Sequence, residues 1–77
     1  MIIIRYTGWK YGLQKISLVE LLQDYAHLSL GESKHMVDKI LRNQVQEVYL
    51  KDISIALELL KRSQELGAVC ELSTTDK

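Results

Sequence analysis

The chain of 77 residues has room for one small domain. Ten lysines and arginines balance ten aspartates and glutamates, and this formal net charge of zero argues against a dedicated nucleic-acid-binding protein. Hydrophobic residues make up 47% and charged residues 26% of the chain, so we expect a folded globular domain rather than a disordered segment.

The first segment has the composition of a β-strand. Residues 1–6 (MIIIRY) are mostly β-branched or aromatic, which favours extended structure. The apolar run ends at Arg5 and is too short for a signal peptide or a membrane span, so we expect no membrane association. Residues 7–14 (TGWKYGLQ) contain two glycines, which predict a loop.

Helical periodicity follows, from Ile16 to Leu28. Apolar residues gather on one side of this predicted helix and polar residues on the other. We therefore expect Leu18 and Leu22 to lie in the core.

A second helix is predicted to begin directly afterwards. The stretch from Ser29 to Glu32 fits a capping box, in which each of these two side chains satisfies a free backbone N–H. The helix should then run to about Asn43. Its inner face would carry Val37 and Ile40 into the core.

The second half of the chain reads as strand, helix and strand. Residues 45–50 (VQEVYL) predict a strand, and Asp52 is a suitable N-cap for a helix over 53–66. Gly67 stands where a left-handed C-terminal cap is needed. Residues 68–72 (AVCEL) alternate in polarity and predict the third strand.

The last predicted helix is apolar over an unusually wide arc. One group contains Leu57 and Leu60, which we assign to the core, and the other contains Ile55 and Leu59. The second group either packs against a neighbouring helix or forms part of a self-association patch. The chain is accordingly expected to be a monomer or a weak homodimer.

These elements predict a single domain over residues 1–77, with a frayed polar tail at 73–77. The order β-α-α-β-α-β indicates an α+β, two-layer fold. Its three-stranded antiparallel sheet would be covered on one face by three helices.

Two segments resemble a known family. Residues 15–41 (KISLVELLQDYAHLSLGESKHMVDKIL) resemble the first two helices of the C-terminal domain of the bacterial ribosomal stalk protein, large-subunit protein seven/twelve. Residues 59–72 (LLKRSQELGAVCEL) resemble its last helix and strand. The two patterns align from Lys15 to Leu72 without a gap, and the resemblance implies the same fold as the periodicity.

The resemblance also implies a protein-interaction face and a role near translation. The stalk domain recruits translational GTPases through a helical face of apolar residues, lysine and arginine. Its apolar members correspond to Ile16 and Val19, but its two central cations correspond to Glu20 and Gln23. Because lost positive charge weakens attraction to an acidic partner, we expect a partner other than a stalk-type GTPase. The predicted face consists of Ile16, Val19, Glu20, Gln23 and Lys34.

A related fold belongs to the ClpS adaptor, which delivers N-degron substrates to a protease. Residues 48–53 (VYLKDI) resemble its strand-to-helix step. The adaptor's substrate site uses an Asn-Asp-Asp segment after the first strand, whereas residues 6–9 here read Tyr-Thr-Gly-Trp. A degron-adaptor activity is therefore the less favoured alternative.

Two further features have both a structural and a functional interpretation. Trp9, Lys10 and Tyr11 form either an exposed recognition loop or a segment folded back so that the tryptophan covers the core. His35, Lys39 and Arg42 share an outer helix face, which is either simply solvated or a contact for nucleic acid. The nucleic-acid interpretation is the less favoured one.

Catalytic and cofactor chemistry find little support in the sequence. The chain contains no nucleophile elbow, P-loop or HExxH motif, so we expect no enzyme activity and no cofactor. His27, His35 and the single cysteine Cys70 do not have zinc-ligand spacing, so we expect no metal. A single cysteine excludes an internal disulfide and suggests a reducing cytoplasmic location. We expect Cys70 to be a small core residue.

Overall fold

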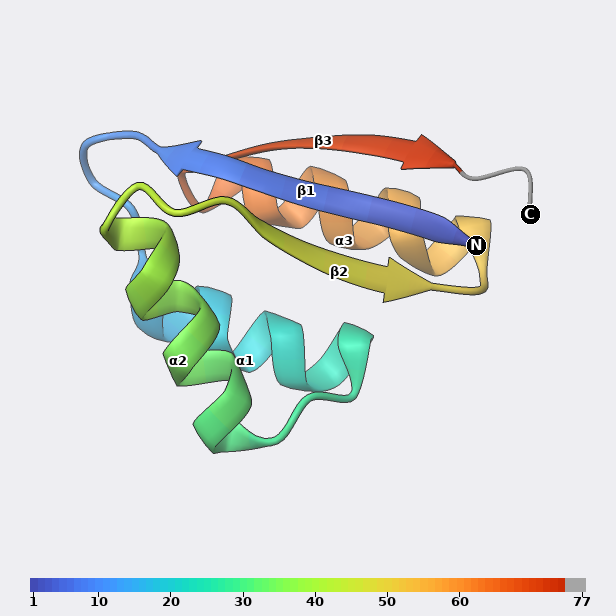
Figure 1. Cartoon of the computed structure of the whole chain (residues 1–77), viewed down its shortest axis with the longest axis horizontal. Helices are drawn as coiled ribbons and strands as arrows, with labels where there is room; N and C mark the ends of the chain where they lie inside the picture. Colours follow the sequence, from blue (N-terminus) through green and yellow to red (C-terminus); the bar gives the residue numbers. More distant parts are fainter. Residues whose placement is uncertain (75–77) are drawn as a thin grey trace.

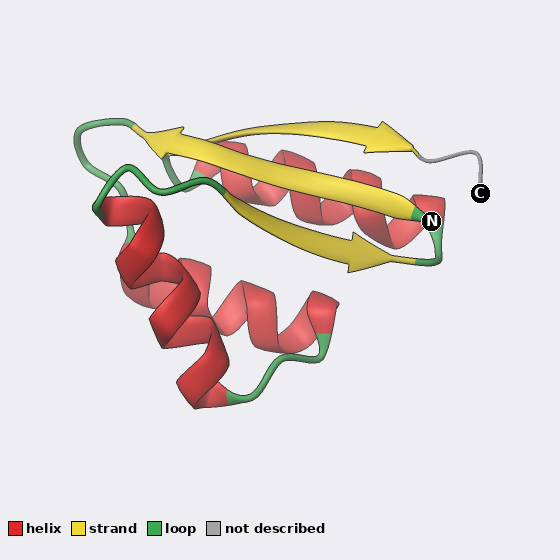
Figure 2. Cartoon of the chain, viewed as in Figure 1, coloured by secondary structure: helices red, strands yellow, loops and turns green. Residues whose placement is uncertain are grey.

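The computed structural model describes residues 1–74, which follow the predicted order β-α-α-β-α-β (Figure 1). The strands form one antiparallel sheet in the order β2-β1-β3, and the helices lie on one face of it (Figure 2). The predicted α+β fold class is therefore confirmed. The elements are β1 (Ile2–Trp9), α1 (Lys15–Ala26), α2 (Leu30–Leu41), β2 (Gln46–Leu50), α3 (Ile53–Glu65) and β3 (Ala68–Thr74).

The first strand is longer than predicted. Residues 7–9 continue β1 instead of beginning a loop, because β3 offers them a pairing partner. Tyr6 pairs with Cys70 and Gly8 with Val69, so Thr7 is an extra residue that bulges out of the ladder. Glycines in the sequence suggested a loop, but a glycine inside a strand also accompanies a bulge.

The last strand is also longer than predicted. Ser73 and Thr74 belong to β3, where they pair with Ile3 and Ile2. The prediction of a frayed tail is therefore wrong for these two residues. The remaining part of that predicted tail, residues 75–77, lies outside the described residues.

The element boundaries follow the predicted caps. The Ser29 hydroxyl accepts from the Glu32 N–H at 3.1 Å, and the Glu32 carboxylate accepts from the Ser29 N–H at 3.0 Å. Asp52 caps α3 by accepting from the backbone N–H of Ser54 at 2.8 Å. Gly67 has φ +108°, and a Cβ there would lie 3.0 Å from the Leu13 backbone. Only glycine therefore fits this turn.

The core lies between the sheet and the helices. Four of the six predicted core residues, Leu18, Leu22, Val37 and Ile40, are buried as expected. Leu60 is half-buried, and the assignment of Leu57 is wrong because 52% of it is exposed. The fully buried positions of α3 are instead Ala56, Leu59 and Ser63. Burial of Leu59 also removes it from the self-association patch considered above.

A buried hydrogen bond explains why α3 is rotated this way. The hydroxyls of Tyr6 and Ser63 lie 2.8 Å apart, and both residues are fully buried. Burial raises the pKa of the Tyr6 phenol well above its ordinary value, so the group stays neutral. An unpaired hydroxyl in this position would carry a desolvation cost. Turning Ser63 toward Tyr6 therefore places Leu57 at the surface.

We predict that the two hydroxyls are strongly coupled in stability. Tyr6→Phe leaves the Ser63 hydroxyl unpaired, and Ser63→Ala leaves the Tyr6 hydroxyl unpaired, so each should lower the free energy of unfolding by about 1–3 kcal/mol. The double variant removes both polar groups and should lose less than the sum of the two single losses. Urea unfolding of all four proteins measures this coupling, and additive losses would contradict it.

We predict opposite outcomes for two leucines of α3 that are two residues apart. Leu59→Ala should lower the free energy of unfolding by about 2–5 kcal/mol because it leaves a cavity in the core. Leu57→Ala should cost less than about 1 kcal/mol because its side chain is half in water. Urea unfolding of the two variants tests the rotation of the helix. A larger loss for Leu57→Ala would show that the helix faces the other way.

Candidate functional site

A shallow hollow between α1 and α2, here called the α1–α2 groove, has a volume of about 230 Å³. It lies between the first half of α1 and one side of α2, two helices that follow each other in the chain and cross in Figure 1. The residues that line it are Lys15, Ile16, Val19, Lys34, Val37, Asp38 and Leu41. Three of the five residues predicted as the interaction face therefore meet here, namely Ile16, Val19 and Lys34.

The groove has an apolar floor. Val19 and Val37 are 9% and 3% exposed, so they present only a small part of their surface to solvent. Ile16 differs from the two valines, because it is 73% exposed. It lies at the edge of the groove. An exposed branched aliphatic residue beside a buried apolar floor is a suitable contact for an apolar side chain of a partner.

The edge of the groove carries positive charge from two helices. Lys15 begins α1 and Lys34 lies in the first half of α2. Within residues 1–74, neither lysine takes part in an ion pair. The one carboxylate of the groove, Asp38, lies 3.2 Å from the guanidinium of Arg42. The two lysines are therefore the charges that a partner could neutralise.

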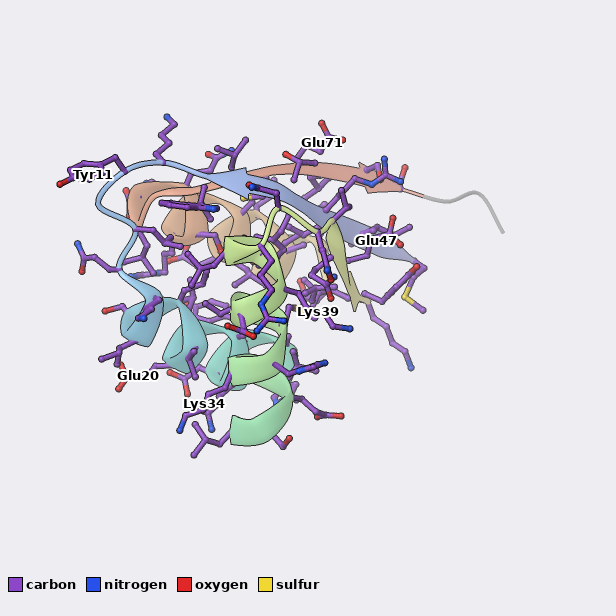
Figure 3. All side chains as sticks on the ribbon, turned by 60° about the vertical axis from the view of Figure 1, so that its left-hand side comes forward. Tyr11, Glu20, Lys34, Lys39, Glu47 and Glu71 are labelled. Carbon is purple, nitrogen blue, oxygen red and sulfur yellow. The ribbon has the colours of Figure 1, made fainter. Side chains whose placement is uncertain are left out.

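The other two residues of the predicted face do not line this groove. Glu20 lines a separate hollow between α1 and α3, together with the carboxylates of Asp24 and Glu65. Within residues 1–74, the one cation of this hollow, Arg62, pairs with Glu58 at 2.6 Å, so acidic charge is in excess. Gln23 is half-buried and lines neither hollow. Figure 3 shows Glu20 extending from α1 and Lys34 from α2. The structure thus divides the predicted face into an apolar, basic groove and an acidic flank.

Besides Lys15 of α1, three groove residues of α2 were missing from the predicted interaction face: Val37, Asp38 and Leu41. Val37 had been assigned to the core alone. All three follow Lys34 at helical spacings of three, four and seven residues, which place them on one side of α2. Extending the face from Lys34 along the helix by this spacing would have found them.

The segment from Trp9 to Tyr11 is divided between two environments. The bulge turns Trp9 to the helical side of the sheet, where its indole N–H donates to the Leu41 carbonyl at 3.2 Å. That carbonyl belongs to the last residue of α2, and Trp9 is 39% exposed. Tyr11 is fully exposed and extends away from the body (Figure 3). Lys10 anchors the loop through its backbone N–H, which donates to the Gly67 carbonyl at 2.8 Å.

The basic residues of α2 do not form a free cationic surface. Arg42 pairs with Asp38, four residues before it, and Lys39 is half-buried. His35 is exposed. Only part of the positive charge on this face is therefore available to a phosphate backbone.

Other chemically active groups lie apart from the groove. Cys70 is buried in the core as predicted, and burial raises the pKa of its thiol to about 11. The described part of the chain brings no three metal-ligating side chains together. None of the helices in residues 1–74 is long and apolar enough to cross a membrane.

Comparison of the chain with models of known protein families finds no match, and comparison with curated proteins finds no similar sequence.

Proposed function

We propose that the chain is a small protein-interaction module that binds its partner through the α1–α2 groove. The observation that carries this proposal is the convergence of Ile16, Val19 and Lys34, from two helices, on one hollow with an apolar floor. These residues are neighbours in space although fifteen positions separate Val19 from Lys34. The partner contributes apolar side chains to the floor and carboxylates to the two lysines.

The dimensions of the groove favour a helix as the bound element. A hollow of about 230 Å³ accommodates a few aliphatic side chains rather than a large ligand. An amphipathic helix supplies such side chains at spacings of three, four and seven residues, and its flanks can carry acidic residues. On this proposal the module acts by binding a helix of its partner.

The resemblance to the stalk domain supports the same face but a different partner. Lys15, Ile16, Val19 and Lys34 match that family's interaction residues, which suggests a partner connected with translation. Glu20 replaces a cation of the family pattern and lies beside Asp24 and Glu65. This acidic flank repels a partner whose acidic surface extends beyond the groove, because like charges at close range are costly. A narrow acidic helix can bind while avoiding the flank.

We predict that the groove discriminates between peptides by charge. The first probe is a designed helical peptide with leucines at i, i+3 and i+7 flanked by glutamates; the second has lysines in place of the glutamates. The glutamate peptide should bind at least about tenfold more tightly, because it neutralises Lys15 and Lys34. Titration of ¹⁵N-labelled protein locates the contact through the amide shifts of α1 and α2. Equal affinities for the two peptides would contradict the proposal.

A pair of substitutions separates the groove from the rest of the surface. Ile16→Asp places a negative charge at the edge of the groove and should abolish binding of the glutamate peptide. Val45→Asp makes the same kind of change at another exposed residue, 53% exposed and outside the groove, and should leave binding unchanged. Equal loss of binding in both variants would place the contact elsewhere.

We also predict that restored charge restores attraction to stalk-type partners. Purified translation elongation factors should not bind the unmodified protein in the micromolar range. Glu20→Lys with Gln23→Arg should introduce measurable affinity, because the pair adds two cations and removes the acidic side chain beside Asp24. Calorimetric titration of both proteins measures the difference. Micromolar binding of the unmodified protein would show that the lost charge does not matter.

A further inference from the structure

The β3 strand has an outer edge that no other strand covers within residues 1–74. The strand order β2-β1-β3 places it at the border of the sheet, with β1 on its inner side. Edge strands are commonly protected by proline, lysine or a bulge. The sequence of β3 (AVCELST) contains neither proline nor lysine, and the bulge of this sheet lies in β1. The edge is therefore open to pairing with another chain.

One part of this edge is already occupied. The side-chain amide of Gln64 in α3 donates to the Cys70 carbonyl at 3.2 Å. Main-chain groups alternate between the two sides of a strand, so those that remain for a new strand belong to Leu72 and Thr74. Those of Glu71 and Ser73 point toward β1. This gives a short pairing segment centred on Leu72, which is itself half-buried.

An apolar stripe lies beside the same edge. The Gln64 side chain reaches the Cys70 carbonyl, so the side of α3 that carries Gln64, and Leu60 four residues before it, faces the strand's border. Leu57 precedes Leu60 by three residues, and Ile53 precedes Leu57 by four. Both therefore lie on that side of the helix too. They are 52% and 47% exposed. Ile53 and Leu57, here called the α3 stripe, thus run along the open strand, as α3 follows β3 in Figure 1.

We propose that this border is a homodimer interface, in which β3 pairs antiparallel with β3 of a second copy. A two-fold axis at Leu72 would join the two sheets into one of six strands. The α3 stripes of the two copies would then meet beneath the junction. Such an interface is self-complementary, as closed two-fold symmetry requires.

The side chains of β3 suit this register. With Leu72 opposite Leu72 of the second copy, Glu71 lies opposite Ser73 of that copy. The two glutamates therefore do not face each other directly, which avoids the repulsion of like charges in a cross-strand pair. The start of α3 lies near the end of β3, because the turn at Gly67 reverses the chain between them. Ile53 and Leu57 consequently lie close to the proposed axis.

The α3 stripe favours a second copy over an extended peptide as the occupant. A peptide strand would satisfy the main-chain groups of Leu72 and Thr74, but it brings no helix to cover Ile53 and Leu57. A second copy covers both features at once, the strand with its strand and the stripe with its stripe. The pairing segment is short, so the interface belongs to the weak class of small buried area.

This inference goes beyond the proposed function and does not depend on it. No residue of β3 or α3 lines the α1–α2 groove, so the two surfaces are separate. A dimer formed through β3 would leave both grooves open. Failure of peptide binding would therefore not contradict the proposed dimer. A protein that stays monomeric would not contradict the proposed binding groove.

Sedimentation velocity of the full chain over total concentrations from about 10 μM to about 1 mM tests the proposal. We expect a dimer whose fraction rises with concentration. Ile53→Lys with Leu57→Lys should raise the dimer dissociation constant at least about tenfold. Val45→Lys is the control, since it alters an apolar residue that is as exposed as Leu57 and lies outside α3, β3 and the α1–α2 groove. A monomer at every concentration, or an equal effect of the control, would overturn the proposal.

A second measurement locates the interface without altering the α3 stripe. A spin label is attached at Ser73→Cys in a Cys70→Ala background. This protein is mixed with ¹⁵N-labelled protein that carries no spin label. Amide signals of Glu71 to Thr74 in the ¹⁵N copy should broaden most. Broadening that centres on α1 and α2 instead would show that the copies associate through the groove and would refute the β3 interface.

Discussion

The hydrogen bond between Tyr6 and Ser63 fixes how the third helix lies against the sheet. It joins the central strand to α3 in the middle of the core, where neither hydroxyl has access to water. Because a buried polar pair tolerates little change in geometry, it selects one rotation of the helix from the two that its wide apolar arc would allow. Everything on the surface of α3 follows from this choice, including the exposure of Ile53 and Leu57.

The bulge at Thr7 has a comparable effect at the other end of β1. It shifts the alternation of side chains by one residue, so that Trp9 faces the helices together with Ala68. The indole then donates to the carbonyl of Leu41, which also lines the α1–α2 groove. The bulge in β1 thereby helps to fix the position of the end of α2. A single extra residue in one strand supports one wall of the candidate site.

Periodicity and capping signals were sufficient to predict the fold, because each local signal agrees with the global arrangement. Ser29, Asp52 and Gly67 marked the ends of helices correctly. The exceptions are polar residues in the core. Ser33 and Ser63 are both fully buried, and the hydroxyl of Ser33 has no partner within residues 1–74. Hydropathy assigns such serines to the surface. It therefore predicted the wrong face of α3 to be buried, with Leu57 in the core in place of Ser63. The candidate site was predicted at Ile16, Val19 and Lys34, where the family resemblance matches it. It was missed along α2, where the helical spacing from Lys34 leads on to Val37, Asp38 and Leu41.

The position of β1 has a consequence for synthesis of the protein. Of the three strands of this sheet, the central one is synthesised first, and both of its neighbours follow much later in the sequence. Until β2 and β3 have emerged, Ile2 and Ile4 have no sheet to join, although both end in the core. Long-range pairings of this kind slow folding and prolong the exposure of apolar strands. The nascent chain therefore carries an aggregation-prone apolar strand until β3, the last strand of this sheet, has emerged.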